Sequence, residues 1–255
     1  MITLNHIILA AGKGTRMKHH TTTRAKGMIN FGGLPLLVRQ LHIIQKNGPD
    51  CIFIVRGYRA DDIYFPNMYN VKYFTNTKYC STNMIESLMC ARPCFFKDTV
   101  VSYADIIYNY DMLQAISNTE EDFVVAVDVN REYYLKIRYG KIDTDTESLK
   151  INDYGLITNI GKPNPSLEEI DGRYVGLLKF SKKGLKIIEE IYDSDEKWKT
   201  AYMTDLLQEI INRGHKVYPL EVWNGWIEFD TVDDYKKNKR WLERDQLSHL
   251  LNLKL

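Results

Sequence analysis

The N-terminal segment constrains the fold most, because a short apolar run there breaks into a glycine-rich, basic turn. Residues 7–11 (Ile-Ile-Leu-Ala-Ala) predict a buried strand, and the turn that follows consists of Gly12, Lys13, Gly14, Thr15 and Arg16. Glycine has no Cβ, so backbone N–H groups in such a turn can approach a polyphosphate closely, and an arginine can hold phosphate oxygens with its planar guanidinium. The glycine spacing is that of neither a P-loop nor a dinucleotide-binding turn. The sequence therefore predicts a phosphate-binding loop of another kind.

Length and composition limit the class of protein. At 255 residues, with 44% hydrophobic and 26% charged residues, the chain suits one α/β domain with a sizeable core. The net charge of +1 gives no general basic surface for nucleic acid, so we expect phosphate recognition to be local. No apolar run reaches the length of a membrane span, and the first strand begins almost at once, so we expect a cytoplasmic protein without a membrane partner. The four cysteines lack the spacing of a zinc site and are expected to be free thiols.

Alternating strand and helix patterns predict a mostly parallel sheet with helices on both faces. The expected strands are residues 7–11, 51–55, 99–103, 123–127, 174–180, 216–222 and 226–229. The expected helices are residues 36–44, 112–118, 185–191 and 203–212, and a terminal helix that begins at Thr231. Residues 141–156 are polar and turn-rich, which indicates an extended flap or a small two-stranded insertion.

A family resemblance comes from the order of several motifs. The segment Leu9-Ala10-Ala11-Gly12-x-Gly14-Thr15-Arg16, a later Lys26 and the segment Gly33-x-Pro35-Leu36-Leu37 resemble the N-terminal signature of nucleoside-triphosphate transferases. That superfamily includes sugar-1-phosphate nucleotidyltransferases and cytidylyltransferases. The resemblance implies a Rossmann-like three-layer sandwich with a mixed, mostly parallel sheet. Lys26 stands between Ala25 and Gly27, where sugar-nucleotide enzymes usually have two prolines. The positive charge is therefore kept, but the prolines that would make the loop rigid are missing.

A second polar block resembles the cytidylyltransferase branch. The block Asn76-x-x-Tyr79-x-Ser81-Thr82-Asn83-Met84-x-x-Ser87-Leu88 is similar to the segment that lines the base and ribose pocket in phosphocholine and aminoethylphosphonate cytidylyltransferases. A capped helix beginning at Thr82 or Asn83 would explain one of these residues but not the density of polar groups. For CTP, we expect backbone carbonyls of residues 9–11 to accept from the cytosine amine, and Ser81, Asn83 and Ser87 to donate to the ring carbonyl. The nucleotide-binding residues that we predict are Leu9, Ala10, Ala11, Gly12, Lys13, Gly14, Thr15, Arg16, Ser81, Thr82, Asn83, Ser87, Tyr103 and Ala104.

Two aspartates at predicted strand ends are candidate metal ligands. Asp105 follows the strand at residues 99–103, and Asp230 follows the strand at residues 226–229, directly before a helix. Carboxylates from two segments can hold one Mg²⁺, or Mn²⁺ in its place, with phosphate oxygens completing the shell. Asp230 would serve equally well as part of a helix cap. The resemblance implies that Asp105 and Asp230 share the metal, while Arg16 and Lys26 neutralise the triphosphate as the other catalytic residues.

The acceptor is less constrained by the sequence. The resemblance extends to enzymes that activate aminoethylphosphonate, phospho-L-glutamine for capsule phosphoramidate, or phosphocholine. Charged candidates suit a zwitterionic, amino-acid-like acceptor, whereas aromatic candidates suit choline. The acceptor-binding residues that we predict are Asp128, Arg138, Lys162, Tyr174, Trp198, Tyr202 and Glu228. We expect phospho-L-glutamine or a phosphonate before phosphocholine.

The resulting hypothesis is a single domain over residues 1–255. It has a nucleotide-binding half (1–130), an acceptor-binding half with a flap (131–230) and a C-terminal helix (231–255). It transfers CMP from CTP to a small phosphorylated or phosphonylated acceptor. One alternative is a sugar-1-phosphate nucleotidyltransferase that uses UTP or dTTP, and another is a nucleotide-binding regulatory or scaffold subunit without activity. The C-terminal leucines either pack on the protein's own sheet or form a dimer interface, so monomer and homodimer both stay open.

Overall fold

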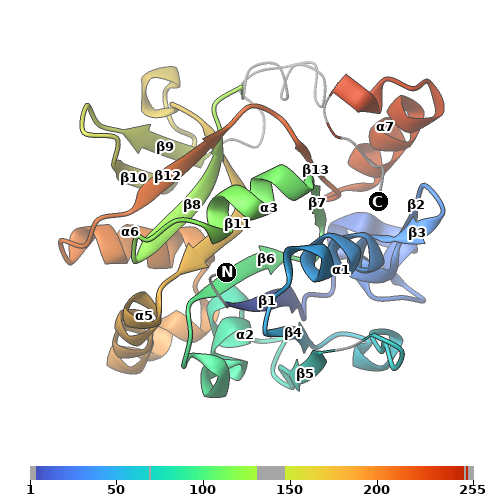
Figure 1. The fold of residues 1–255 in the computed structure, drawn as a ribbon, viewed down its shortest axis with the longest axis horizontal. Coiled ribbons are helices and arrows are strands. Elements are labelled where there is room, and N and C mark those ends of the chain that lie inside the picture. Colours follow the sequence, from blue (N-terminus) through green and yellow to red (C-terminus); the bar gives the residue numbers. More distant parts are fainter. Residues whose placement is uncertain (1–3, 69, 131–146, 250, 252–255) are drawn as a thin grey trace.

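A seven-stranded sheet forms the centre of the molecule in the computed structural model, which describes residues 4–68, 70–130, 147–249 and 251 (Figure 1). From one edge to the other, its strands are β12 (Tyr218–Val222), β8 (Phe123–Asp128), β11 (Arg173–Phe180), β6 (Thr99–Tyr103), β1 (Asn5–Ala10), β4 (Cys51–Arg56) and β5 (Val71–Thr75). Only β11 runs antiparallel to its neighbours, β6 and β8, and the other pairs are parallel. The expected mixed, mostly parallel sheet is therefore confirmed.

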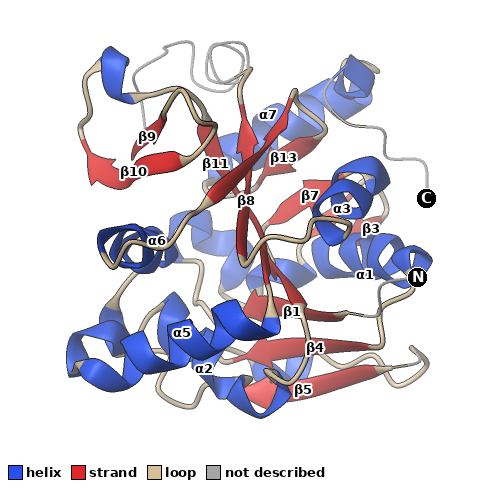
Figure 2. Cartoon of the chain, turned by 60° about the vertical axis from the view of Figure 1, so that its left-hand side comes forward, coloured by secondary structure: helices blue, strands red, loops and turns tan. Residues whose placement is uncertain are grey.

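Helices cover both faces of this sheet, because successive strand side chains point to opposite faces. On β1, Ile7 and Leu9 belong to one buried cluster, together with side chains of α2 (Met84–Cys90), α5 (Lys182–Ser194) and α6 (Met203–Asn212). Ile8 and Ala10 belong to another cluster, with α1 (Leu36–Asn47) and α3 (Tyr110–Ser117). Figure 2 shows the sheet between these two helical layers. The three-layer sandwich implied by the family resemblance is confirmed.

Three short antiparallel pairs accompany the main sheet. They are β2 (Asn30–Phe31) with β3 (Leu34–Pro35), β7 (Ile106–Tyr108) with β13 (Trp226–Glu228), and β9 (Glu147–Ile151) with β10 (Ile157–Pro163). The pair of β9 and β10 is the small insertion expected near residues 141–156, although residues 141–146 lie outside the described residues. Residues 106–108 and 71–75 form strands that the sequence did not indicate.

The C-terminal segment packs on the protein's own core. Helix α7 (Val232–Glu243) begins at a capping box, in which the Thr231 hydroxyl accepts from the Asp234 backbone N–H. After it, Leu247 and Leu251 are each only 2% exposed and join a third buried cluster with Phe31 and Phe229. For the described part of this segment, internal packing therefore accounts for the apolar residues.

Within the part of the chain that the structure describes, no helix is both long enough and apolar enough to cross a membrane.

Candidate active site

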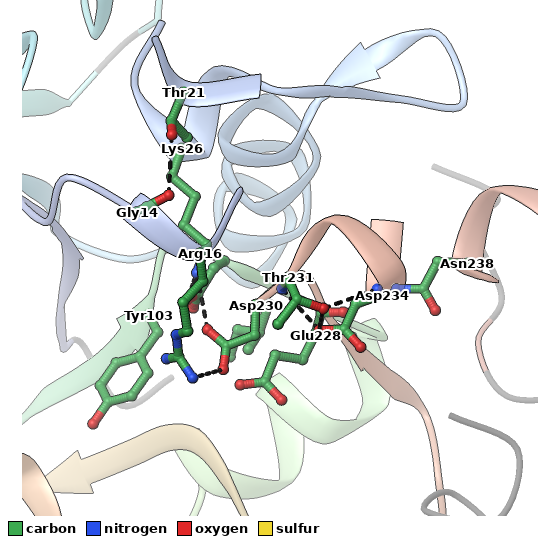
Figure 3. Close-up of polar contacts among 12 residues, drawn as sticks. Gly14, Arg16, Thr21, Lys26, Tyr103, Glu228, Asp230, Thr231, Asp234 and Asn238 are labelled. Atoms are coloured by element: carbon green, nitrogen blue, oxygen red, sulfur yellow. Dashed lines mark hydrogen bonds and ion pairs between the residues drawn. The ribbon is translucent and has the colours of Figure 1, made fainter. Parts of the chain in front are cut away.

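The glycine-rich loop leaves β1 at the carboxyl edge of the sheet and turns back over Lys26. Gly14 has a φ of +62°, and a Cβ at this position would lie 3.0 Å from Cδ of Lys26. Its carbonyl accepts a hydrogen bond of 3.0 Å from the Thr21 hydroxyl, which closes the loop (Figure 3). Glycine is therefore required here both for the left-handed backbone and for the close approach of the lysine stem.

The pairing of β7 with β13 brings the two candidate metal ligands together. Glu228 pairs with Ile106 in this ladder, and the Phe229 N–H donates to the Asp105 carbonyl at 2.9 Å. Asp105 lies in the turn between β6 and β7. Asp230 lies two residues after the end of β13 and directly before Thr231, which caps α7. Two carboxylates that are far apart in the sequence thus meet beside the glycine-rich loop.

Lys26 and Arg16 are the cations at this pair of carboxylates. Figure 3 shows the Arg16 guanidinium pointing toward the Asp230 carboxylate. The Lys26 ammonium lies 2.5 Å from Oδ2 of Asp105 and 3.1 Å from Oδ1 of Asp230. Nη1 of Arg16 lies 2.9 Å from Oδ2 of Asp230, and its side chain is 61% exposed, whereas that of Lys26 is 14% exposed. Lys26 is therefore held between the carboxylates, and Arg16 stands at the solvent side where an anionic ligand can reach it.

Burial and charge act in opposite directions on the pKa values of this cluster. Burial lowers the pKa of Lys26, but the carboxylates of Asp105 and Asp230 outweigh it, and the pKa is raised above its ordinary value. Burial, with the nearby Glu228 carboxylate, raises the pKa of Asp230 to about 6, against the effect of the lysine and of Arg16. Additional positive charge at this point would favour the ionised carboxylate.

The donor set fits a hard divalent cation. Carboxylate oxygens are preferred by Mg²⁺, which usually takes one or two carboxylates and completes its shell with water and substrate phosphate oxygens. The Lys26 ammonium already shows that a cation is stabilised between Asp105 and Asp230. Among the described residues no group of three or more His, Cys, Asp or Glu side chains gathers as a metal site. In the described part of the chain, a divalent cation at this place would have Asp105 and Asp230 as its carboxylate ligands.

A cavity of about 330 Å³ opens beside the charge cluster. It brings together most of the predicted nucleotide-binding residues, namely Leu9, Ala10, Ala11, Gly12, Gly14, Thr15, Arg16, Thr82, Asn83, Ser87, Tyr103 and Ala104. Two predicted residues do not line it. The Lys13 ammonium lies 5.8 Å from the centre of the Tyr58 ring, and the Ser81 hydroxyl donates to the Lys78 carbonyl.

A second cavity of about 210 Å³ shares part of its wall with the first. Both cavities are lined by Arg16, Tyr103, Tyr202, Glu228 and Asp230. Lys26 and Asp105 line only the first, and Tyr174 lines only the second. The Tyr174 and Tyr103 hydroxyls are 2.9 Å apart, and burial raises the pKa of both phenols, so they stay protonated at neutral pH. Arg173 donates from Nη2 to Oε2 of Glu228 at 2.6 Å. The second cavity therefore carries aromatic, basic and acidic side chains next to the charge cluster.

Three of the predicted acceptor-binding residues, Asp128, Lys162 and Trp198, line neither of the two cavities. Asp128 is fully buried, and its carboxylate accepts hydrogen bonds from the Trp226 indole N–H at 2.8 Å and from the Asn130 N–H at 2.9 Å. The Lys162 ammonium pairs with Glu169 at 2.7 Å on the surface. Trp198 is 4% exposed and belongs to the hydrophobic core. Arg138 lies outside the described residues.

Other lining residues were missed by the sequence analysis. Gly27, Tyr79 and Met84 line the first cavity, and the polar block quoted for the resemblance contained the last two. Glu147, Ser148, Leu149, Arg173, Met203 and Thr204 line the second. They come from β9, β11 and α6, and no local pattern distinguishes them from ordinary strand and helix residues.

The fold and the site agree with the family to which the chain belongs. The MobA-like NTP transferase domain family matches residues 6–189, so the chain is a member of that family and an enzyme of the nucleotidyltransferase class. It is 30% identical to CTP:phosphoglutamine cytidylyltransferase of Campylobacter jejuni subsp. jejuni, over 91% of this chain and 97% of that protein. It is 24% identical to choline-phosphate cytidylyltransferase of Streptococcus pneumoniae, over 94% of this chain and 98% of that protein.

A solved structure has the same fold. The structure of CTP:phosphocholine cytidylyltransferase from Streptococcus pneumoniae matches with a TM-score of 0.77 and 22% identity, over 94% of this chain and all of that one. The resemblance drawn from the N-terminal motifs is confirmed by the family match and by the 30% identity to the Campylobacter jejuni protein.

Proposed function

We propose that this protein is a Mg²⁺-dependent cytidylyltransferase that transfers CMP from CTP to a small phosphorylated or phosphonylated acceptor and releases pyrophosphate. The observation that carries the proposal is the cluster of Lys26, Arg16, Asp105 and Asp230, which lines the first cavity and reaches the adjoining second cavity through Arg16 and Asp230. The first cavity, of about 330 Å³, would take the nucleotide, and the adjoining one, of about 210 Å³, would take the acceptor. The similarity to cytidylyltransferases over nearly the whole chain supports CTP as the nucleotide.

The residues of the cluster suit in-line transfer without a protein nucleophile. In that reaction an oxygen of the acceptor phosphate forms a bond to the α-phosphorus, and the bond from that phosphorus to the bridging oxygen of pyrophosphate breaks. Arg16 and Lys26 would offset the charge that develops on the leaving pyrophosphate. Mg²⁺, or Mn²⁺ in its place, held by Asp105 and Asp230, would act as a Lewis acid on the phosphate oxygens. Binding of the triphosphate would give Lys26 phosphate partners in addition to its carboxylates.

For the acceptor we propose a zwitterion, with phospho-L-glutamine or aminoethylphosphonate ahead of phosphocholine. The second cavity is lined by Arg16 and Arg173 on the one hand and by Glu147 and Glu228 on the other. Both signs of charge suit a molecule that carries an amine as well as phosphate or carboxylate groups. Its tyrosines also suit a quaternary ammonium, which keeps phosphocholine as the second candidate.

A pyrophosphate-release assay tests this function. CTP, UTP, dTTP and ATP would each be combined with phospho-L-glutamine, aminoethylphosphonate, phosphocholine and a sugar 1-phosphate in the presence of Mg²⁺. We expect release with CTP and a zwitterionic acceptor. Release with UTP or dTTP and the sugar phosphate would place the protein among sugar-nucleotide enzymes. CTP binding without release in any combination would favour a regulatory or scaffold subunit.

A further inference from the structure

A buried asparagine, Asn76, lies behind two hydroxyl-bearing residues that line the first cavity, which is here called the nucleotide cavity. Asn76 directly follows β5, is 2% exposed and is not among the residues that line the cavity. Its side-chain Nδ2 donates to Oγ1 of Thr82 and to Oγ of Ser87, at 3.1 Å in each case. Both hydroxyl-bearing residues line the cavity. Asn76 thus contacts two side chains of the site from the protein interior.

The orientation of this amide is fixed by the backbone. Oδ1 of Asn76 accepts a hydrogen bond of 2.9 Å from the Lys78 N–H. The opposite orientation would set the NH₂ group against that N–H and would leave a donor facing a donor. The NH₂ group must therefore point toward Thr82 and Ser87, and each hydroxyl oxygen must use one lone pair to accept from it.

The hydroxyl hydrogens are also engaged. The Thr82 hydroxyl donates to the Lys78 carbonyl at 2.8 Å, and the Ser87 hydroxyl donates to the Asn83 carbonyl at 3.3 Å. A hydroxyl has one hydrogen and two lone pairs. With the hydrogen and one lone pair used, each of the two groups offers the cavity a single remaining lone pair. Toward a ligand they are acceptors and not donors.

We propose that Asn76 is a positioning residue for nucleotide choice, because it holds the Thr82 and Ser87 hydroxyls as acceptors for the exocyclic amine of cytosine. Uracil carries a carbonyl in place of that amine, so its oxygen would face an acceptor that has no hydrogen to give. The inference rests on the proposed use of CTP and specifies how the site rejects UTP. It also reverses the sequence-based expectation that Ser87 donates to the base.

The experiment compares CTP with UTP in three variants. Asn76→Ala removes the hydrogen bonds that the Asn76 amide donates to the Thr82 and Ser87 hydroxyls, so both hydroxyl groups can rotate. Ser87→Ala removes one acceptor and leaves Asn76 in place. Asn5→Ala is the matched control, since Asn5 is 1% exposed, donates to the Cys94 carbonyl and does not line the cavity. Calorimetric dissociation constants for CTP and UTP are measured for each protein, and kcat and KM are measured with the acceptor that gives the highest turnover.

We expect the preference for CTP over UTP to fall about tenfold in Asn76→Ala and in Ser87→Ala, which is the size of one lost or mismatched hydrogen bond. The change should appear in the dissociation constant and KM, with kcat for CTP altered little. In Asn5→Ala the ratio should stay at the wild-type value even if the protein is less stable. A merely structural role of Asn76 would weaken both nucleotides equally.

The outcomes separate this inference from the proposed function. An unchanged ratio in both Asn76→Ala and Ser87→Ala, in a protein that binds and uses CTP, overturns the role of Asn76 and leaves the cytidylyltransferase intact. If the wild-type protein binds neither nucleotide, the proposed function itself fails. If Asn76→Ala does not fold, the ratio in Ser87→Ala decides, because alanine is well tolerated inside helix α2.

Discussion

A methyl group added at Gly176 should disturb the wall between the two cavities. Gly176 lies in β11 with a φ of +84°, at a point where the pairing of β11 with β8 shifts register between Tyr174 and Leu178. A Cβ there would lie 2.8 Å from Cδ2 of Tyr103, which lines both cavities. The Gly176→Ala variant therefore has to strain the backbone and displace the Tyr103 ring.

The two costs can be separated with a second glycine. The positive φ costs an alanine roughly 1–2 kcal/mol, and the close contact with a packed ring costs roughly a further 1–3 kcal/mol. Gly155 has a φ of +71°, and a Cβ there would meet no atom within 4 Å. We therefore expect Gly155→Ala to lose about 1–2 kcal/mol of unfolding free energy and Gly176→Ala about 2–5 kcal/mol.

Urea denaturation of the two variants and the wild type measures this difference. Gly176→Ala should in addition raise KM for the nucleotide and for the acceptor, because Tyr103 contacts both cavities, whereas Gly155→Ala should leave both values near those of the wild type. Equal losses of stability in the two variants would refute the steric argument. Normal KM values in a strongly destabilised Gly176→Ala would refute the role given to Tyr103.

Three further predictions concern the charge cluster, the core and the C-terminal segment. Asp105→Asn and Asp230→Asn should each lower kcat by about a hundredfold or more with an unchanged circular dichroism spectrum, because each removes a charged metal ligand; near-normal turnover would exclude that residue. Burial lowers the pKa of His6 from 6.5 to about 3, so the unfolded chain takes up a proton on acidification that the folded chain does not. Between pH 7 and pH 5 the wild type should therefore lose about 2 kcal/mol more unfolding free energy than His6→Asn, as urea titrations at both pH values would measure. Leu247→Ala should lose about 2–4 kcal/mol without changing the mass measured by light scattering, whereas loss of a dimer would indicate an interface.

Periodicity identified the parts of the fold that are buried on both faces. The runs that became β4 and β6 were visible because residues 51–55 are all apolar and residues 99–103 contain no charged side chain. Strand β5 (Val71–Thr75) lies at the edge of the sheet and is only partly buried, so its sequence lacks such a run. The pairing of β7 with β13 also left no local signal, because it joins segments more than a hundred residues apart.

Asp105 and Asp128 show why the site was only partly predictable. Asp128 is the last residue of β8, and Asp105 lies two residues after the end of β6. The strands β6 and β8 belong to the same sheet and run in the same direction, because each is antiparallel to β11. Locally the two residues are equivalent candidates. They differ in the partner that the fold supplies. The Asp128 carboxylate accepts a hydrogen bond from the Trp226 indole N–H in the protein interior, whereas Asp105 forms an ion pair with Lys26 at the first cavity. Such partners come from distant parts of the chain and cannot be inferred from spacing.

The fate of the α-phosphorus of CTP tests the central claim most directly. The protein would be incubated with Mg²⁺, phospho-L-glutamine and CTP labelled either at the α- or at the γ-phosphorus, and the products would be separated by chromatography. The account predicts that the α-label enters a CMP-linked acceptor and that the γ-label appears only in pyrophosphate. Transfer of the γ-label to the acceptor, or release of the α-label only as free CMP, would contradict it.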